Sequence, residues 1–253
     1  GSPTWDSFFV CHPFVSHFVF IAQKMSLCYN DNIVSGEAGE RERGDGMIRL
    51  IFSDMDGTLL DGEGNLPAEF GAMYEQLRAR GIRFAPASGR QYASLVQTFA
   101  PWRDELIFVA ENGTLVMEHG AELCATPVER AIALEVMRAG EELAGVHALL
   151  CGKRQAYLRA TDEAPDFRAE LEKYVSVSAV VEDFAAVDDV PIKMAFCDLS
   201  GHAAQTILPV MQRYADRLQV TLSSSEWVDV YSQGVNKGIA AKRIQERLGV
   251  TPD

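Results

Sequence analysis

Basic residues are scarce in this chain, which has 23 Lys and Arg against 36 Asp and Glu in 253 residues. The net charge of -13 argues against binding to nucleic acid or attachment to an anionic membrane. A small anionic substrate is still compatible, because a bound cation and a few Lys or Arg side chains can make one site locally positive. We therefore expect a small-molecule partner, no nucleic acid and no membrane, and the sequence leaves the oligomeric state open.

Cysteine is also sparse, and none of the five cysteines forms a C-x-x-C pair. Their scatter argues against both a disulfide framework and a zinc site, and it fits the reduced thiols of the cytoplasm, where we expect the protein to lie. The sequence also contains no internal repeat.

The first 46 residues lack the features of a signal peptide. Their apolar stretch has no basic region before it, carries Asp6, and contains His and Pro. It is also short for a membrane span. The charged, Gly-rich segment 36–46 that follows predicts a disordered linker. Our hypothesis is that residues 1–46 are added or upstream sequence and that Met47 is the natural start; a genuine N-terminal extension is the alternative.

An apolar run from Ile48 to Phe52 is followed at once by two aspartates, in the stretch M-I-R-L-I-F-S-D-M-D-G-T-L-L-D. Such a run is typical of a strand that is buried on both faces of a parallel sheet. Asp54 and Asp56 come at its carboxyl end, which is where ligands bind in open α/β sheets. Their i, i+2 spacing directs both side chains to one side if the backbone stays extended through Met55.

Two carboxylates so close together repel one another and favour a cation, and hard oxygen ligands suit Mg²⁺. A carboxylate beside Mg²⁺ can attack a phosphorus atom and form an aspartyl-phosphate. A second carboxyl can protonate the leaving oxygen and later activate water. Gly57 then permits a tight turn and a close approach of the backbone to a ligand. An isolated D-x-D has a simpler alternative, an acidic turn after a strand.

The residues from 47 to 127 alternate between strand and helix patterns. Apolar residues at i, i+3, i+4 and i+7 predict helices over 70–77 and 92–99. Further strands are expected at 82–87 and 106–110. The order strand–helix–strand–helix–strand predicts a parallel, Rossmann-like α/β sheet.

Hairpins mixed with short helices follow, and this change of pattern predicts an inserted α+β domain over residues 128–222. A hairpin is expected around Gly152-Lys153-Arg154, whose charged tip is more simply a solvated tip than a substrate contact. Pro209 predicts a kink or a later start for the helical pattern over 204–218.

A strand at 227–231 and a helix that ends at Gly249 are assigned to a second part of the core. The predicted division is therefore an extension at 1–46, a first core part at 47–127, an insert at 128–222 and a second core part at 223–253.

Four more polar residues lie at strand ends or helix starts. Ser88 could donate to a phosphate beside backbone N–H groups, or simply cap a helix. Arg90 could contact a phosphate or substrate, or form a salt bridge, and Asn112 could bind a ligand or cap a turn. Lys237 opens a helix, where the dipole disfavours a cation, and this favours a phosphate contact for it.

In order and spacing these segments resemble the motifs of the haloacid dehalogenase (HAD) superfamily of phosphohydrolases. D-M-D-G-T resembles the first motif, the strand followed by S-G-R the second, and G-V-N-K-G the third. The long insert between the second and third motifs, preceded by E-N-G, is similar to the Cof-type branch with a type-IIB cap. The resemblance covers about residues 47–253, and it implies a HAD-like core with an inserted cap.

The resemblance implies a Mg²⁺-dependent phosphatase of small phosphorylated metabolites, such as sugar phosphates. Asp54 would be the nucleophile and Asp56 the acid/base, and both would hold Mg²⁺, Asp56 through its backbone carbonyl. The cap would close over the substrate and exclude water. The implied phosphate-binding residues are Gly57, Thr58, Ser88 and Lys237, with Arg90 and Asn112 as further candidates for substrate contact.

Two alternatives stay open: a phosphomutase of the phosphomannomutase kind, and a non-enzymatic phospho-acceptor like a signalling receiver. The large insert and Asp56 count against a receiver. The sequence also reaches Asp253 before any G-D-x-x-N-D loop, the family's fourth motif, which supplies further Mg²⁺ carboxylates. We therefore expect a chain truncated at its C-terminus, with a weak metal site, an exposed sheet edge and a risk of inactivity.

Overall fold

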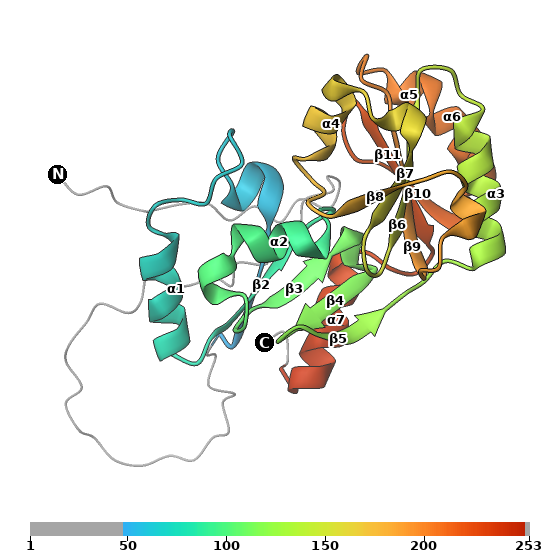
Figure 1. The fold of residues 1–253 in the computed structure, drawn as a ribbon. Helices are drawn as coiled ribbons and strands as arrows, with labels where there is room; N and C mark the ends of the chain where they lie inside the picture. The colour runs from blue at the N-terminus through green and yellow to red at the C-terminus, as the bar shows by residue number, and fades with distance from the viewer. Residues whose placement is uncertain (1–47, 251–253) are drawn as a thin grey trace, which may run out of the picture.

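The computed structural model describes residues 48–250, which form two sheets with helices packed on each (Figure 1). The predicted extension over residues 1–46 lies outside the described residues. The first sheet has the strand order β1-β2-β3-β4-β5 and consists of β1 (Leu50–Asp54), β2 (Arg83–Ala87), β3 (Ile107–Ala110), β4 (Leu115–Glu118) and β5 (Ala121–Ala125). The second has the order β10-β11-β9-β6-β7-β8 and consists of β6 (His147–Gly152), β7 (Ala156–Arg159), β8 (Ser178–Val181), β9 (Pro191–Cys197), β10 (Leu218–Leu222) and β11 (Trp227–Ser232).

The parallel part of the first sheet confirms the α/β prediction. β1 pairs with β2 and β2 with β3, all parallel. β4 and β5 extend this sheet as an antiparallel hairpin, which the sequence analysis did not identify. This hairpin turns at His119 and Gly120, both with positive φ. The core sheet is therefore mixed. Its parallel strands lie on the side of edge strand β1, which leads into Asp54 and Asp56.

Alternation of side chains along β1, β2 and β3 gives the first sheet two apolar faces. One face, with Ile51, Phe84 and Phe108, packs against the predicted helices α1 (Phe70–Ala79) and α2 (Tyr92–Thr98). The other face packs against α7 (Lys237–Leu248), which ends as predicted at Gly249, where φ is 62°. Burial on both faces explains why these strands are near-continuous apolar runs.

The second sheet is also covered on both faces. α3 (Arg130–Glu141), α5 (Ala203–Thr206) and α6 (Leu208–Met211) pack on one face. α4 (Pro165–Leu171) packs on the other, where Leu115 of β4 joins the same apolar cluster. The short helical turns of the described chain are Met55–Leu59, Ala100–Trp102, Glu111–Gly113, Ala160–Asp162, Phe184–Ala186 and Gln212–Tyr214.

The helical pattern over 204–218 forms two short helices rather than one. α5 ends before Ile207 and α6 starts at Leu208, with Pro209 in its first turn. Proline has no backbone N–H, so it cannot continue the hydrogen bonds of the preceding helix. The start of α6 at Leu208 therefore confirms the predicted later start. Leu218 begins strand β10 instead of continuing the helical face.

Strand β11 departs from the expected division of the chain. Residues 227–231 were predicted to belong to the second core part, yet β11 pairs antiparallel with β9 and β10 of the second sheet. The chain leaves the first sheet after β5 and returns to it only after β11. We therefore propose an insert that extends to Ser232. None of the helices within residues 48–250 is long and apolar enough to cross a membrane.

Gly113 allows the first sheet and α7 to approach closely, and its substitution gives a clear test of this packing. Its φ is +93°, and an added Cβ would lie 2.7 Å from the carbonyl oxygen of Asn236 and 3.2 Å from Ala240 Cβ. We expect Gly113→Ala to lower the free energy of unfolding by about 3 kcal/mol in urea titration, from strain and overpacking together. Gly120→Ala is the control, since its φ is +73° with no atom within 4 Å of the added Cβ. Its expected loss is only about 1 kcal/mol; equal losses would contradict the role of packing.

Candidate active site

Asp54 lies buried at the carboxyl end of β1, where the sequence predicted it. Its Oδ1 accepts from the Met55 backbone N–H at 2.9 Å and from Lys237 Nζ at 2.6 Å. Lys237 is the first residue of α7, whose N-terminus is capped by the Asn236 side chain, which accepts from Ile239 N–H at 2.9 Å. The structure thus brings the ends of the first and third motifs into direct contact.

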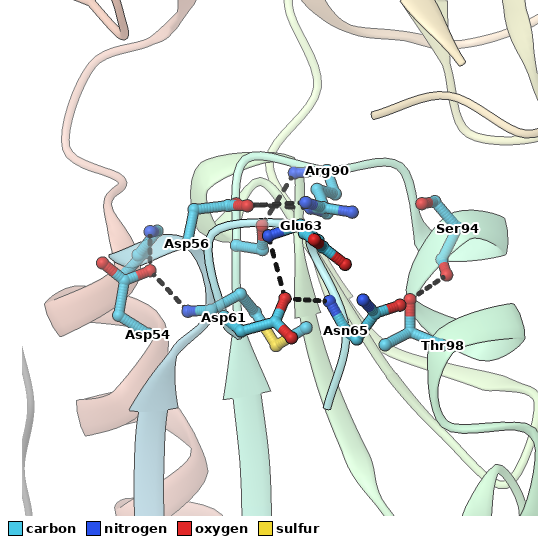
Figure 2. Close-up of polar contacts among 11 residues, drawn as sticks. Asp54, Asp56, Asp61, Glu63, Asn65, Arg90, Ser94 and Thr98 are labelled. Atoms are coloured by element: carbon cyan, nitrogen blue, oxygen red, sulfur yellow. Dashed lines mark hydrogen bonds and ion pairs between the residues drawn. The ribbon is translucent and has the colours of Figure 1, made fainter. Parts of the chain in front are cut away.

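Asp56 lies in the turn that follows, and its side chain points toward a different cation, Arg90 (Figure 2). Its carboxylate accepts from Arg90 Nη2 at 2.6 Å and Nε at 3.3 Å. The turn relies on Gly57, whose φ is 71°. The Asp56 side chain is 51% exposed and that of Arg90 only 12%. The carboxylate is therefore open to solvent, whereas the Arg90 side chain that it contacts is largely buried. Each aspartate of the pair therefore has its own cationic partner.

Asp61, the last residue of the same stretch, has a local structural role. Its Oδ1 accepts from the backbone N–H groups of Asn65 at 2.8 Å and Glu63 at 2.9 Å (Figure 2). The hydrogen bond from Asn65 is the largest of the effects that lower the pKa of Asp61. This carboxylate closes a turn and is not among the residues that line the cavity described below.

Ser88 is buried and held within its own loop. Its Oγ accepts from Arg90 N–H at 3.1 Å, and its carbonyl accepts from Asn112 N–H at 3.0 Å. This is a local turn and not the helix cap expected as the alternative for Ser88, because the N-cap residue of α2 is Gln91. Asn112 itself has a φ of 60° in a left-handed turn, and its Nδ2 also donates to Asp229 Oδ2 at 2.8 Å. Asn112 therefore both forms a turn and contacts the insert.

A cavity of about 560 Å³ lies between the two sheets. Its volume is within the range of small-molecule sites. Five of the predicted site residues line it, whereas Gly57, Thr58 and Ser88 do not. The core contributes Asp54, Asp56, Gly89, Arg90, Asn112, Asn236 and Lys237. The insert contributes Leu149, Tyr174, Val175, Lys193, Ala195, Gln219, Thr221, Leu222, Ser223, Ser224, Trp227, Asp229 and Tyr231.

A second group of charges lies beside this cavity and was not predicted from the sequence. Lys193 Nζ, from β9, lies 2.5 Å from Glu111 Oε2 and 3.8 Å from Asp229 Oδ1, and it donates to the Gly89 carbonyl at 2.9 Å. Lys193 and Asp229 interrupt otherwise apolar strands, P-I-K-M-A-F-C and W-V-D-V-Y, and that signal could have revealed them. Charged residues are rarely buried unless they are paired.

Burial shapes the ionisation of this group. It raises the pKa of the Glu111 carboxyl, which the nearby ammonium of Lys193 only partly offsets. Burial lowers the pKa of Lys193, but the carboxylates of Asp229 and Glu111 outweigh it and leave that pKa above its ordinary value. Lys193 thus stays protonated, and it links the insert to the loop that contains Gly89.

A separate set of hydrogen bonds holds the insert on the core. Gln91, just before α2, accepts through Oε1 from the N–H groups of Ser176 and Val177 at 3.1 and 2.9 Å. Its Nε2 donates to the Val177 carbonyl at 2.8 Å, and its own N–H donates to the carbonyl of Tyr174. The Tyr174 ring in turn lies 5.5 Å from the Arg90 guanidinium. The residue after the second motif therefore fixes the insert loop beside the cavity.

The charged hairpin tip does not reach the cavity. Lys153 pairs with Glu122 of β5 at 2.8 Å, and the Arg154 backbone N–H donates to Asp189 at 3.0 Å. Lys153 is thus a surface contact between insert and core rather than a free solvated tip, and neither residue lines the cavity.

The donor set at Asp54 and Asp56 fits Mg²⁺ bound in its usual manner. Mg²⁺ is commonly held by one or two carboxylates, with waters and substrate phosphate oxygens completing the shell. Asp54 and Asp56 offer hard oxygen atoms and line the cavity together. Within residues 48–250 no group of three or more His, Cys, Asp or Glu side chains is arranged to hold a metal ion. The residues present would thus provide part of the shell of such an ion.

Comparison with known proteins identifies the family of this chain. The family model of haloacid dehalogenase-like hydrolases matches residues 51–253. The chain belongs to the haloacid dehalogenase-like hydrolase family. A relative in Escherichia coli K12, the 5-amino-6-(5-phospho-D-ribitylamino)uracil phosphatase YbjI, is 30% identical over 80% of this chain and 75% of its own length. The HMP-PP phosphatase of Cronobacter sakazakii is 24% identical over 81% of this chain and 75% of its own length.

Solved structures show the same fold. SMU.1108c from Streptococcus mutans matches with a TM-score of 0.72 and 26% identity, over 82% of this chain and 79% of that one. A sugar phosphatase of HAD subclass IIB matches with a TM-score of 0.66 and 17% identity, over 81% and 77% of the two chains. The predicted family and α/β fold are confirmed, and the chain is a hydrolase of this family.

Proposed function

We propose that this HAD hydrolase is a Mg²⁺-dependent phosphatase of small phosphorylated metabolites, acting through an aspartyl-phosphate on Asp54. One observation carries the proposal: a buried carboxylate at a strand end, 2.6 Å from the Lys237 ammonium, lines a cavity of about 560 Å³. The phosphatase names of the two relatives support the substrate class. Of these, the ribitylamino-uracil phosphate ester in the name of YbjI is a small phosphorylated metabolite.

Asp54 is suited to attack phosphorus because the protein fixes one of its oxygens. The Met55 N–H and Lys237 Nζ both bind Oδ1, which leaves Oδ2 as the oxygen for attack. The Lys237 ammonium also lines the cavity, so it can bind an oxygen of the phosphoryl group as negative charge moves toward it. In this way Lys237 orients the nucleophile Asp54 and also stabilises the phosphoryl group that Asp54 attacks.

Asp56 is suited to proton transfer because it lies in the same cavity and remains half exposed. We propose that its carboxyl protonates the oxygen of the leaving group and then, as a carboxylate, takes a proton from the water that hydrolyses the aspartyl-phosphate. Arg90 holds this side chain away from Asp54 in the structure. Asp54 and Asp56 would hold Mg²⁺, which supplies positive charge for the phosphate oxygens. Gly57, Thr58 and Ser88 remain proposed phosphate contacts, through backbone groups or a rearranged loop.

Phosphate release by the full chain tests this proposal. We expect release from a panel of sugar and alkyl phosphates with Mg²⁺, and its loss by at least about 100-fold when EDTA removes the metal. Re-addition of Mg²⁺ should restore it. Added Ca²⁺ should not restore phosphate release, because Ca²⁺ prefers a larger and more flexible set of oxygen ligands. Release that is unaffected by EDTA would contradict the proposed metal dependence. Transfer of the phosphoryl group to a sugar hydroxyl instead of water would identify a phosphomutase.

A further inference from the structure

The insert contributes a row of hydrogen-bonding side chains to the cavity wall. β10 and β11 are antiparallel, with Thr221 opposite Asp229 and Gln219 opposite Tyr231. Side chains two residues apart on a strand share one face, and all four of these residues line the cavity. This wall therefore faces the bound ligand with hydroxyl, amide and carboxylate groups.

Asp229 is the one carboxylate that the insert contributes to the described lining, and its orientation is fixed. Its Oδ2 accepts from Asn112 Nδ2 at 2.8 Å and from Ser223 Oγ at 2.7 Å. Its Oδ1 lies 3.8 Å from Lys193 Nζ, which is too long for a hydrogen bond. The side chain is only 8% exposed. Asp229 lines the cavity, and these contacts leave lone pairs of its Oδ1 free to accept from a ligand.

Lys193 compensates the charge of Asp229 only in part. The ammonium lies closer to Glu111, at 2.5 Å, and also donates to the Gly89 carbonyl. No hydrogen bond from the described residues reaches Asp229 Oδ1, so a hydroxyl donor on a bound ligand would be favoured there. The same ammonium would repel a cationic amine at this position. A neutral hydroxyl therefore fits the open oxygen better than an ammonium group does.

We propose that Asp229 is a specificity-determining residue that binds a hydroxyl group of the leaving alcohol through Oδ1. The inference rests on the proposed phosphatase function, which places the phosphate at Asp54 in the same cavity. Thr221, Ser223 and Tyr231 surround Asp229 with hydroxyls that can donate or accept. The substrates selected are phosphate esters of polyhydroxylated alcohols rather than of alkyl alcohols.

Equilibrium binding tests this proposal separately from turnover. In the Asp54→Asn protein with Mg²⁺, titration calorimetry compares sorbitol 6-phosphate with hexyl phosphate, which has the same carbon chain without the free hydroxyls. We expect sorbitol 6-phosphate to bind about 10- to 100-fold more tightly. Adding Asp229→Asn should reduce this ratio to within about threefold, because the amide of Asn presents a donor or a weaker, neutral acceptor.

Two further variants keep the result interpretable. Asp198→Asn is the matched control, because this buried carboxylate of the insert accepts from Ser200 and Thr206 and does not line the cavity. It should keep the ratio. Ser223→Ala removes one donor that orients Asp229 while its charge remains, and it should reduce the ratio by about 3- to 10-fold. It provides the test if Asp229→Asn proves unstable in thermal melting.

The outcomes separate this inference from the proposed function. The role of Asp229 would be overturned if the Asp54→Asn protein bound sorbitol 6-phosphate and hexyl phosphate equally well. It would also be overturned if Asp229→Asn left the preference for sorbitol 6-phosphate unchanged. Either result would count even if the unmodified chain releases phosphate. An Asp229-dependent ratio would support that role even if the unmodified chain released none. Absence of binding by either ester would count against the subsite.

Discussion

Asp54→Asn is expected to lower phosphate release by roughly four to six orders of magnitude, because the amide cannot replace the carboxylate as nucleophile. Asparagine has nearly the same shape, and its side-chain oxygen can still accept from the Met55 N–H and from Lys237. The fold should therefore be retained, which circular dichroism and thermal melting would verify. Single-turnover assays of phosphate release from a sugar phosphate measure the effect.

Asp61→Asn is the matched control for this loss. Asp61 belongs to the same D-M-D-G-T-L-L-D stretch, but its carboxylate closes a turn with Glu63 and Asn65 and does not line the cavity. We expect phosphate release within about threefold of the unmodified chain, because a surface substitution away from the site has little effect. Similar activity losses at Asp54 and Asp61 would show that the stretch acts through its fold rather than through a nucleophile.

Lys193→Met is expected to cost about 3–5 kcal/mol of unfolding free energy, the largest stability effect that the structure predicts. The substitution removes the ammonium that lies 2.5 Å from Glu111 and 3.8 Å from Asp229, and it leaves two nearly buried carboxylates without their cation. Methionine retains much of the length of the side chain, so packing within β9 changes little. Urea titration monitored by Trp fluorescence measures the loss.

The pH dependence of this loss identifies its cause. Burial already raises the pKa of Glu111 above 4.5, and removing Lys193 takes away the charge that opposes this shift. A carboxyl whose pKa is higher in the folded state favours folding while protonated, and that contribution is lost as pH rises through the folded pKa. The stability of Lys193→Met should therefore fall as pH rises through the folded-state pKa of Glu111, and the double variant Lys193→Met with Glu111→Gln should weaken this fall. An equal fall in both would exclude Glu111 as the cause.

Lys153→Met controls for the loss of a lysine between insert and core. Lys153 pairs with Glu122 at 2.8 Å, but the two side chains are 28% and 41% exposed. Exposed ion pairs contribute at most about 1 kcal/mol, so we expect a small change in stability. A loss as large as that of Lys193→Met would show that burial is not the decisive difference between the two ion pairs.

The local elements of the chain follow from the sequence with few exceptions. The spacing of Phe70, Tyr74 and Leu77 predicted α1, and Gly249 marked the end of α7, because apolar periodicity and left-handed glycine caps act within a few residues. The first motif was equally readable, since D-M-D-G-T follows a strand directly. The resemblance paired it with the third motif, and in the structure Lys237 contacts Asp54.

Contacts between distant residues were decided only by the tertiary structure. The β4–β5 hairpin and the pairing of β11 with the second sheet were not predicted from the sequence, because strand pairing depends on partners far away in sequence. The Lys193, Glu111 and Asp229 group is the clearest case. Each residue read alone is a charge in an apolar segment, and only the docking of insert on core brings the three together. Sequence by itself thus determined the family, the strand that carries Asp54 and the kind of chemistry. The shape of the cavity and the groups that face a leaving alcohol depend on how two sheets pack, and no local pattern encodes that packing.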